Sequence, residues 1–316
     1  MRHTLSLPIL IITLIMVSGC TLPGLGMTNY GVVLEDIVAE PNELQSGEPF
    51  VIRTRIRNSG QIRAENMLVK IFNTGTEMYS DIRCSPSYEM ISNCEVPFDL
   101  VGEDRERGVQ GESKTCAWNC IAPILEKGVT IPYNPSIRMY YSYTASTIKP
   151  VLITSQDELI RLQSEGKPPP SQPGSTTEGP VSLDIKVKGP LKVWQGKRQL
   201  EFPIEIDVQN IGEGTVCSLG IVGTQIQGCD NPENWNRIVL FSKSLDIIFS
   251  DCDLEYGQTI LNLWKGRGKI VCNAEMMFPM AMVNVQKNIE ISAVYDYFID
   301  KSVSVTVRGT SDIELI

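Results

Sequence analysis

The chain has 316 residues, of which 42% are hydrophobic and 21% are charged, and its formal net charge at pH 7 is −9. This composition excludes an intrinsically disordered chain and a polytopic membrane protein, and the acidic excess argues against a nucleic-acid partner. The one histidine, His3, lies in an N-terminal segment that we expect to be removed, which leaves no imidazole for catalysis or metal binding. We therefore expect no enzyme, no catalytic residue, no metal site and no cofactor.

Residues 1–19 have the features of an export signal. A basic start precedes an uncharged apolar stretch from Leu5 to Val17, which is shorter than the roughly 20 helical residues that span a bilayer. The segment ends in Val17-Ser18-Gly19-Cys20, which resembles the lipobox of prokaryotic lipoproteins. The resemblance implies that Cys20 carries a lipid at the mature N-terminus, and residues 20–30 then form a tether. The alternative is an uncleaved anchor helix, and both readings place the rest of the chain outside the membrane.

Alternating patterns predict β-strands in a first domain, which we place at residues 31–153. In the clearest strand, residues 50–57, apolar side chains alternate with arginines, as in a strand with one buried face, and the turn Asn58-Ser59-Gly60 follows. The apolar positions are Phe50, Ile52 and Ile56, and the alternate positions carry Arg53, Arg55 and Arg57.

The three arginines are the sharpest charge feature of the sequence. As a binding surface, Arg53, Arg55 and Arg57 would dock an anionic partner, such as an acidic glycan, a lipid headgroup or an acidic protein. As ordinary strand residues they would face solvent and deter edge-to-edge pairing, and we favour this second interpretation.

Residues 154–180 contain a short helix and a proline-rich linker. Ser155 and Glu158 have the spacing of a capping box, and the helix that they begin is expected to end at Gly166. The prolines that follow favour a semi-extended spacer between two domains.

The second domain, residues 181–316, repeats the strand pattern of the first. Residues 200–208 alternate, and the turn Asn210-Ile211-Gly212 follows them. Trp235 has polar neighbours on both sides, so it is the tryptophan that we expect to be exposed for recognition.

Apart from Cys20, the cysteines divide four and four between the two domains. An even count per domain in an exported chain predicts two disulfides in each, and each set of four allows three pairings. Short loops favour Cys84–Cys94 and Cys217–Cys229, although Cys116 or Cys120 could instead pair with Cys84 or Cys94. A four-cysteine zinc site is the disfavoured alternative, because its second close cysteine pair is missing. The eight are Cys84, Cys94, Cys116, Cys120, Cys217, Cys229, Cys252 and Cys272.

The two domains are related by an internal duplication. Their Asn-x-Gly turns begin 152 residues apart, and Tyr141-Ser142-Tyr143 precedes Tyr295-Asp296-Tyr297 by 154 residues. The turn and the Tyr-x-Tyr strand resemble the CARDB-like, immunoglobulin-like modules of bacterial and archaeal surface proteins. The resemblance implies an all-β chain of two tandem immunoglobulin-like β-sandwich domains, with an N-terminal signal or anchor helix and one short helix before the linker.

These features predict a lipid-anchored protein on the extracellular face of the cell membrane. Its role would be binding or structural: adhesion, envelope organisation, or a subunit of a surface appendage or secretion assembly. Besides the membrane, we expect a protein or surface-polymer partner, no nucleic acid, and strand pairing between copies as a route to a homo-oligomer. The alternative is a ligand- or glycan-binding module presented to an uptake system, and an enzyme with its site in the longer loops ranks last.

Overall fold

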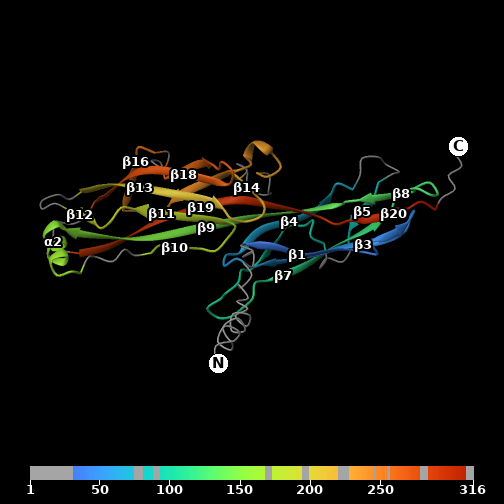
Figure 1. Ribbon diagram of the computed structural model, residues 1–316, viewed down its shortest axis with the longest axis horizontal. Helices are drawn as coiled ribbons and strands as arrows, with labels where there is room; N and C mark the ends of the chain where they lie inside the picture. Colours follow the sequence, from blue (N-terminus) through green and yellow to red (C-terminus); the bar gives the residue numbers. More distant parts are fainter. Residues whose placement is uncertain are drawn as a thin grey trace, which may run out of the picture.

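The computed structural model shows an elongated, mostly β protein (Figure 1). It describes residues 31–74, 81–87, 93–167, 173–193, 199–219, 228–244, 246–252, 254, 257–277 and 284–310. The expected signal at 1–19, Cys20 and the expected tether lie outside the described residues. Within the described parts of the chain, no helix has the length and apolar character needed to cross a bilayer. The all-β architecture of several sheets expected from the sequence is confirmed.

The first half contains a four-stranded antiparallel sheet with the order β1-β3-β7-β5. Its alternation is as predicted, because Ile52 and Ile56 are fully buried while the arginines between them face outward. Trp118 of β7 completes this core and is also buried. The strands are β1 (Val32–Glu40), β3 (Pro49–Asn58), β5 (Arg83–Pro86) and β7 (Ser113–Ile121).

The second half contains an equivalent antiparallel sheet with the order β11-β13-β18-β16. Ile204, Ile206 and Val208 of β13 are buried, so the second alternating run also packs its apolar face inward. The strands are β11 (Val181–Val187), β13 (Gln199–Asn210), β16 (Ile247–Ser250) and β18 (Arg267–Met277).

A third, nine-stranded sheet runs through both halves. Its centre is the antiparallel pair of β9 (Ser136–Ser155) and β19 (Asn284–Ser302), in register from Ser136 opposite Ser302 to Thr154 opposite Asn284. This ribbon follows most of the long axis of the molecule (Figure 1). Its flanking strands are β4 (Ala64–Phe72), β6 (Phe98–Leu100), β10 (Ser175–Thr176), β12 (Leu191–Val193), β14 (Thr215–Cys217), β15 (Arg237–Ser242) and β17 (Gln258–Asn262).

Each half is completed by a strand from the other. β20 (Val305–Arg308) comes from the end of the chain, yet it lies between β2 (Glu43–Gln45), parallel to it, and β8 (Thr130–Tyr133), antiparallel to it. In the equivalent positions of the second half, the C-terminal end of β9 lies parallel to β12 and antiparallel to the start of β19. The predicted limits at 31–153 and 181–316 divide the chain by sequence, whereas the strand pairing crosses between these two segments.

The Asn-x-Gly turn of the first half is held by a tyrosine. Asn58 Nδ2 donates to Ile62 O at 2.8 Å, and Gly60 N donates to Asn58 Oδ1 at 3.1 Å. Ile62 N donates to the Tyr143 hydroxyl at 3.2 Å. A Cβ at position 60 would collide with that hydroxyl, so the close approach requires glycine.

The second turn repeats this arrangement. Asn210 Nδ2 donates to Gly214 O at 2.9 Å, Gly212 N donates to Asn210 Oδ1 at 3.2 Å, and Gly214 N donates to the Tyr297 hydroxyl at 2.8 Å. The matching chemistry at equivalent positions supports the internal duplication.

Four disulfides connect the eight cysteines, two in each half, as expected. The favoured Cys84–Cys94 bond is wrong, because the pairing of β5 with β7 sets Cys84 directly opposite Cys120. Cys217–Cys229 is confirmed. The bonds are Cys84–Cys120, Cys94–Cys116, Cys217–Cys229 and Cys252–Cys272.

The predicted short helix is α2 (Gln156–Ser164). The Ser155 hydroxyl accepts from Glu158 N at 3.2 Å, which gives the expected N-terminal cap. Gly166 has φ +69° just beyond the helix end, where a left-handed residue is commonly found. After the gap in the described residues, β10 pairs with β9, so this part of the linker adds a short strand to the shared sheet.

Candidate binding surface

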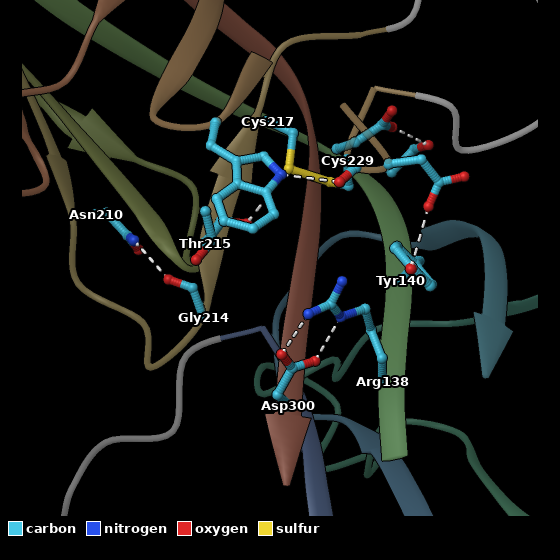
Figure 2. The surroundings of a disulfide bond; sticks show 12 residues. Arg138, Tyr140, Asn210, Gly214, Thr215, Cys217, Cys229 and Asp300 are labelled. Carbon is cyan, nitrogen blue, oxygen red and sulfur yellow. Dashed lines mark hydrogen bonds and ion pairs between the residues drawn. A yellow bond between two sulfur atoms is a disulfide. The ribbon is translucent and has the colours of Figure 1, made fainter. Parts of the chain in front are cut away.

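A cluster of aromatic and charged side chains lies on the face of the β9–β19 ribbon that points away from the sandwich cores. Cross-strand register places Arg138 opposite Asp300 and Tyr140 opposite Phe298. Arg138 Nε and Nη2 donate to Asp300 Oδ1 and Oδ2, both at 2.7 Å, which forms a bidentate ion pair (Figure 2). Because both residues belong to long paired strands, the sheet fixes this geometry.

The guanidinium of Arg138 lies among three aromatic rings. Its central carbon is 4.4 Å from the ring centroid of Phe298, 5.1 Å from that of Phe72 and 5.9 Å from that of Tyr140. These distances allow cation–π attraction. The hydrogen bond to Asp300 raises the pKa of Arg138 above its ordinary value, and burial raises that of Tyr140, so the cluster keeps its cation and its neutral phenol at physiological pH.

The Cys217–Cys229 disulfide lies beside this cluster (Figure 2). Cys217 on β14 is bonded to Cys229, and the Tyr140 hydroxyl donates to Asp230 Oδ1 at 3.2 Å. Trp235 packs against Phe298 with their ring centroids 5.2 Å apart. We define the aromatic–arginine cluster as Phe72, Arg138, Tyr140, Trp235, Phe298 and Asp300.

Trp235 is less open than its polar sequence neighbours suggested. Its Nε1 donates to Cys229 O at 2.8 Å, and the indole is half-buried against the Cys217–Cys229 disulfide. The edge that a sugar or peptide would need is therefore occupied by an internal hydrogen bond. A recognition role for Trp235 stays a prediction, and the open part of the cluster is formed by Phe72, which is 38% exposed, and by Arg138 with Asp300.

The arginine stripe is exposed on β3 but carries acidic partners. Arg53 Nη1 lies 3.1 Å from Glu40 Oε2, Arg55 Nε 3.2 Å from Glu35 Oε2, and Arg57 Nη2 2.7 Å from Glu35 Oε1. Both glutamates belong to the neighbouring β1, a pattern that the spacing along β3 could not reveal. The face is therefore less positive than its arginines alone suggested, and a docking role for it stays a prediction.

Asp296 is a buried acid that the sequence reasoning passed over. It accepts a hydrogen bond from Ser142 Oγ at 2.7 Å across the β9–β19 ribbon, and burial raises its pKa to about 6. The sequence offered one indication of its position. Alternation along the strand sets Asp296 on the opposite face from its neighbours Tyr295 and Tyr297, which are both buried. β14 pairs with this part of β19 and sets Cys217 opposite Asp296, whose side chain is buried.

Within the described parts of the chain, no group of three or more histidine, cysteine, aspartate or glutamate residues is arranged to hold a metal ion. One open depression of about 680 Å³ lies on the outer face of the first sheet, beside the Cys84–Cys120 bond, and is lined by Val51, Arg83 and Asn119 among others. Neither observation assigns a ligand.

No protein-family model matches the chain, and no curated protein matches it. Among solved structures it is similar to the secreted serine protease VesC from Vibrio cholerae, with 8% identity and a TM-score of 0.20 over 87% of this chain and 51% of that one. It thus spans about half the length of VesC. It is also similar to the CupB6 tip adhesin from Pseudomonas aeruginosa, with 9% identity and a TM-score of 0.19 over 89% and 99% of the two chains. The Enterococcus faecalis MSCRAMM ACE gives 8% identity and a TM-score of 0.14 over 88% and 95%.

TM-scores this low carry no argument about fold or activity, so the architecture rests on the strand pairing described above. One expectation is nevertheless corrected. The sequence indicated that the chain is not an enzyme, and a secreted protease now stands among the similar structures. The absence of catalysis is therefore not part of the function proposed below.

Proposed function

We propose that this chain is a lipid-anchored protein of the outer cell surface that binds a macromolecular partner through the aromatic–arginine cluster. Four disulfides support an oxidising compartment outside the cytoplasm. The lipobox-like sequence ending at Cys20 supports attachment to the membrane.

The observation that carries the binding role is the composition and rigidity of the cluster. Tryptophan, tyrosine and arginine are the side chains that dominate the binding energy of protein interfaces. Here Tyr140 is buried and Trp235 is half-buried, and they support the arginine from beneath and beside it, so a partner would not have to order Arg138. The partially open Phe72 and the Arg138–Asp300 pair offer one apolar and one charged contact.

Anchoring is tested by cell fractionation and by mass spectrometry of the N-terminal peptide. The wild type should be in the membrane fraction with acyl groups on Cys20, and Cys20→Ser should lose both. An unmodified Cys20 in a membrane-bound protein would contradict lipidation and favour the uncleaved anchor.

Binding is tested by adding the purified mature chain to cells that lack their own copy. Phe72→Ser should lower the amount bound at saturation of the wild type, because it removes the open apolar contact. The matched control is Ile248→Ser, which changes an exposed apolar residue on a sheet of the second half. Equal loss with both variants, or no loss with either, would contradict the cluster as the binding surface.

The alternative role, a glycan-binding module for an uptake system, has no support at Trp235, since the half-buried indole is already hydrogen-bonded within the chain.

A further inference from the structure

Trp264 lies at the tip of the hairpin between β17 and β18 and is 80% exposed. Trp264 and Arg267 exchange both backbone hydrogen bonds, at 2.7 and 3.1 Å, and the two residues between them, Lys265 and Gly266, have φ of +51° and +76°. Two positive φ values are typical of the tight type I′ turn, whose twist matches that of its strands. Leu263, one residue earlier, is buried, so alternation points Trp264 away from the core.

The two charged side chains next to Trp264 in the hairpin are positive. Lys265 and Arg267 are both exposed, and neither forms an ion pair among the residues that the structure describes. Ile211, next to the hairpin, is 37% exposed, and its neighbour Asn210 donates from N to Gly266 O at 2.7 Å. We define the hairpin patch as Ile211, Trp264, Lys265 and Arg267. A tryptophan beside basic side chains is the composition of the membrane–water interface, where the indole sits at headgroup level and the cations meet anionic lipid.

Backbone contacts connect the hairpin patch to the place where the N-terminal segment leaves the domain. The N–H groups of Ile211 and Gly212 donate to Pro180 O at 2.8 and 3.1 Å. Pro180 in turn packs against Gly31, at the start of β1 near the middle of the long axis (Figure 1). The hairpin patch is therefore connected through Pro180 to Gly31, near the middle of the molecule.

The length of that segment limits how far the protein can stand from a bilayer. Cys20 precedes Gly31 by 11 positions. Even a fully extended chain of this length spans at most roughly 40 Å. A lipid on Cys20 thus keeps the middle of the molecule within reach of the headgroups.

We propose that the hairpin patch rests in the headgroup region of the membrane that holds the lipid anchor. Trp264 enters the interface, Lys265 and Arg267 face anionic headgroups, and the two halves extend along the membrane to either side. This inference builds on the proposed anchoring at Cys20, and it adds a second contact that sets the orientation of the protein.

The test places the mature chain, residues 20–316, on vesicles without relying on cellular lipidation. Eight of the nine cysteines are in disulfides, so the thiol of Cys20 can be coupled to a maleimide lipid in vesicles of phosphatidylcholine and phosphatidylglycerol. Brominated acyl chains in the same vesicles quench tryptophans that lie at the interface. Quenching is expected in the wild type, and Trp264→Phe should abolish it. Trp235→Phe is the matched control and should leave the quenching in place.

Charge and anchoring are then separated. Lys265→Glu with Arg267→Glu should reduce quenching on vesicles containing phosphatidylglycerol, and should have a smaller effect on phosphatidylcholine alone. Absence of quenching in the coupled wild type, or quenching that survives Trp264→Phe, would overturn the proposal. Because the coupling is chemical, such a result would leave lipidation of Cys20 in the cell to its own test by mass spectrometry.

Discussion

The exchange of terminal strands between the halves predicts that a substitution near the C-terminus weakens the N-terminal half. Val307 of β20 is fully buried and lies opposite Leu44 of β2, which is also buried. Val307→Ala therefore leaves a cavity beside β2 and β8, which are strands of the first half, although residue 307 belongs to the second repeat.

The expected magnitude follows from the carbon atoms removed. Valine to alanine deletes the equivalent of two methylene groups, worth about 0.8 kcal/mol each, and the cavity left behind adds to this. We expect Val307→Ala to lower the free energy of unfolding by about 2–3 kcal/mol. The matched control is Val271→Ala on β18, where the side chain is 57% exposed and the same change should cost less than about 0.5 kcal/mol.

Hydrogen–deuterium exchange locates the effect and urea unfolding gives its size. In Val307→Ala, peptides covering residues 43–45 and 130–133 should lose protection, because β2 and β8 depend on β20 for their backbone pairing. If these peptides keep their protection while peptides of residues 181–277 lose it, the strand exchange does not stabilise the first half and the reasoning fails.

Three further predictions concern the β9–β19 ribbon and the Cys217–Cys229 disulfide beside it. Because burial raises the pKa of Asp296 to about 6, the folded state binds more protons than the unfolded state between about pH 4 and 6, so stability falls as pH rises through this window. Asp296→Asn should remove that slope and raise the free energy of unfolding at pH 8 by up to about 3 kcal/mol, measured by urea unfolding at several pH values. Replacing Cys217 and Cys229 by serine removes the bond that closes a loop of 12 residues, and it should lower the free energy of unfolding by about 3 kcal/mol in thermal or urea unfolding. Unchanged stability would show that this disulfide does not stabilise the fold. Asp300→Asn leaves the partly buried Arg138 without its charged partner and should cost about 1–3 kcal/mol, whereas a neutral result would show that the aromatic rings alone hold the guanidinium.

Local patterns in the sequence predicted the local structure well. The alternation over residues 50–57 and 200–208 reported directly which side chains are buried, because a strand with one covered face repeats with period two. The Asn-x-Gly turns and the serine cap of α2 were likewise predictable, since each depends on residues within a few positions of one another.

What the sequence did not reveal depends on contacts between distant segments. Loop length favoured Cys84–Cys94, but strand register decides the partner, and Cys84 meets Cys120 across β5 and β7. In the same way, the arginines of β3 read as an unbalanced stripe until β1 brought Glu35 and Glu40 beside them. Pairing of this kind is set by the sheet order, which a period of two cannot encode.

The exposure of the tryptophans shows the same limit at the candidate sites. Trp235 was expected to be exposed because its neighbours in sequence are polar, but its ring packs on Phe298 and its Nε1 donates to the carbonyl of Cys229. Trp264 has a buried neighbour, and its exposure follows from alternation at a hairpin tip. Polar flanks describe a segment, whereas the direction of one side chain depends on the strand that carries it.

The duplication also has a consequence for how the two halves can act. If the repeats were separate domains joined by a flexible linker, residues 154–180 would let them move independently. Instead, β9 and β19 pair along their lengths, and the strand that ends each repeat is built into the other. Bending between the halves would break backbone hydrogen bonds of the central ribbon. The two proposed surfaces therefore keep fixed positions on one rod-like body: the aromatic–arginine cluster on β9 and β19, and the hairpin patch beside Asn210. Because they are fixed relative to each other, orienting the protein at the membrane through the hairpin patch would also orient the surface proposed to bind a partner.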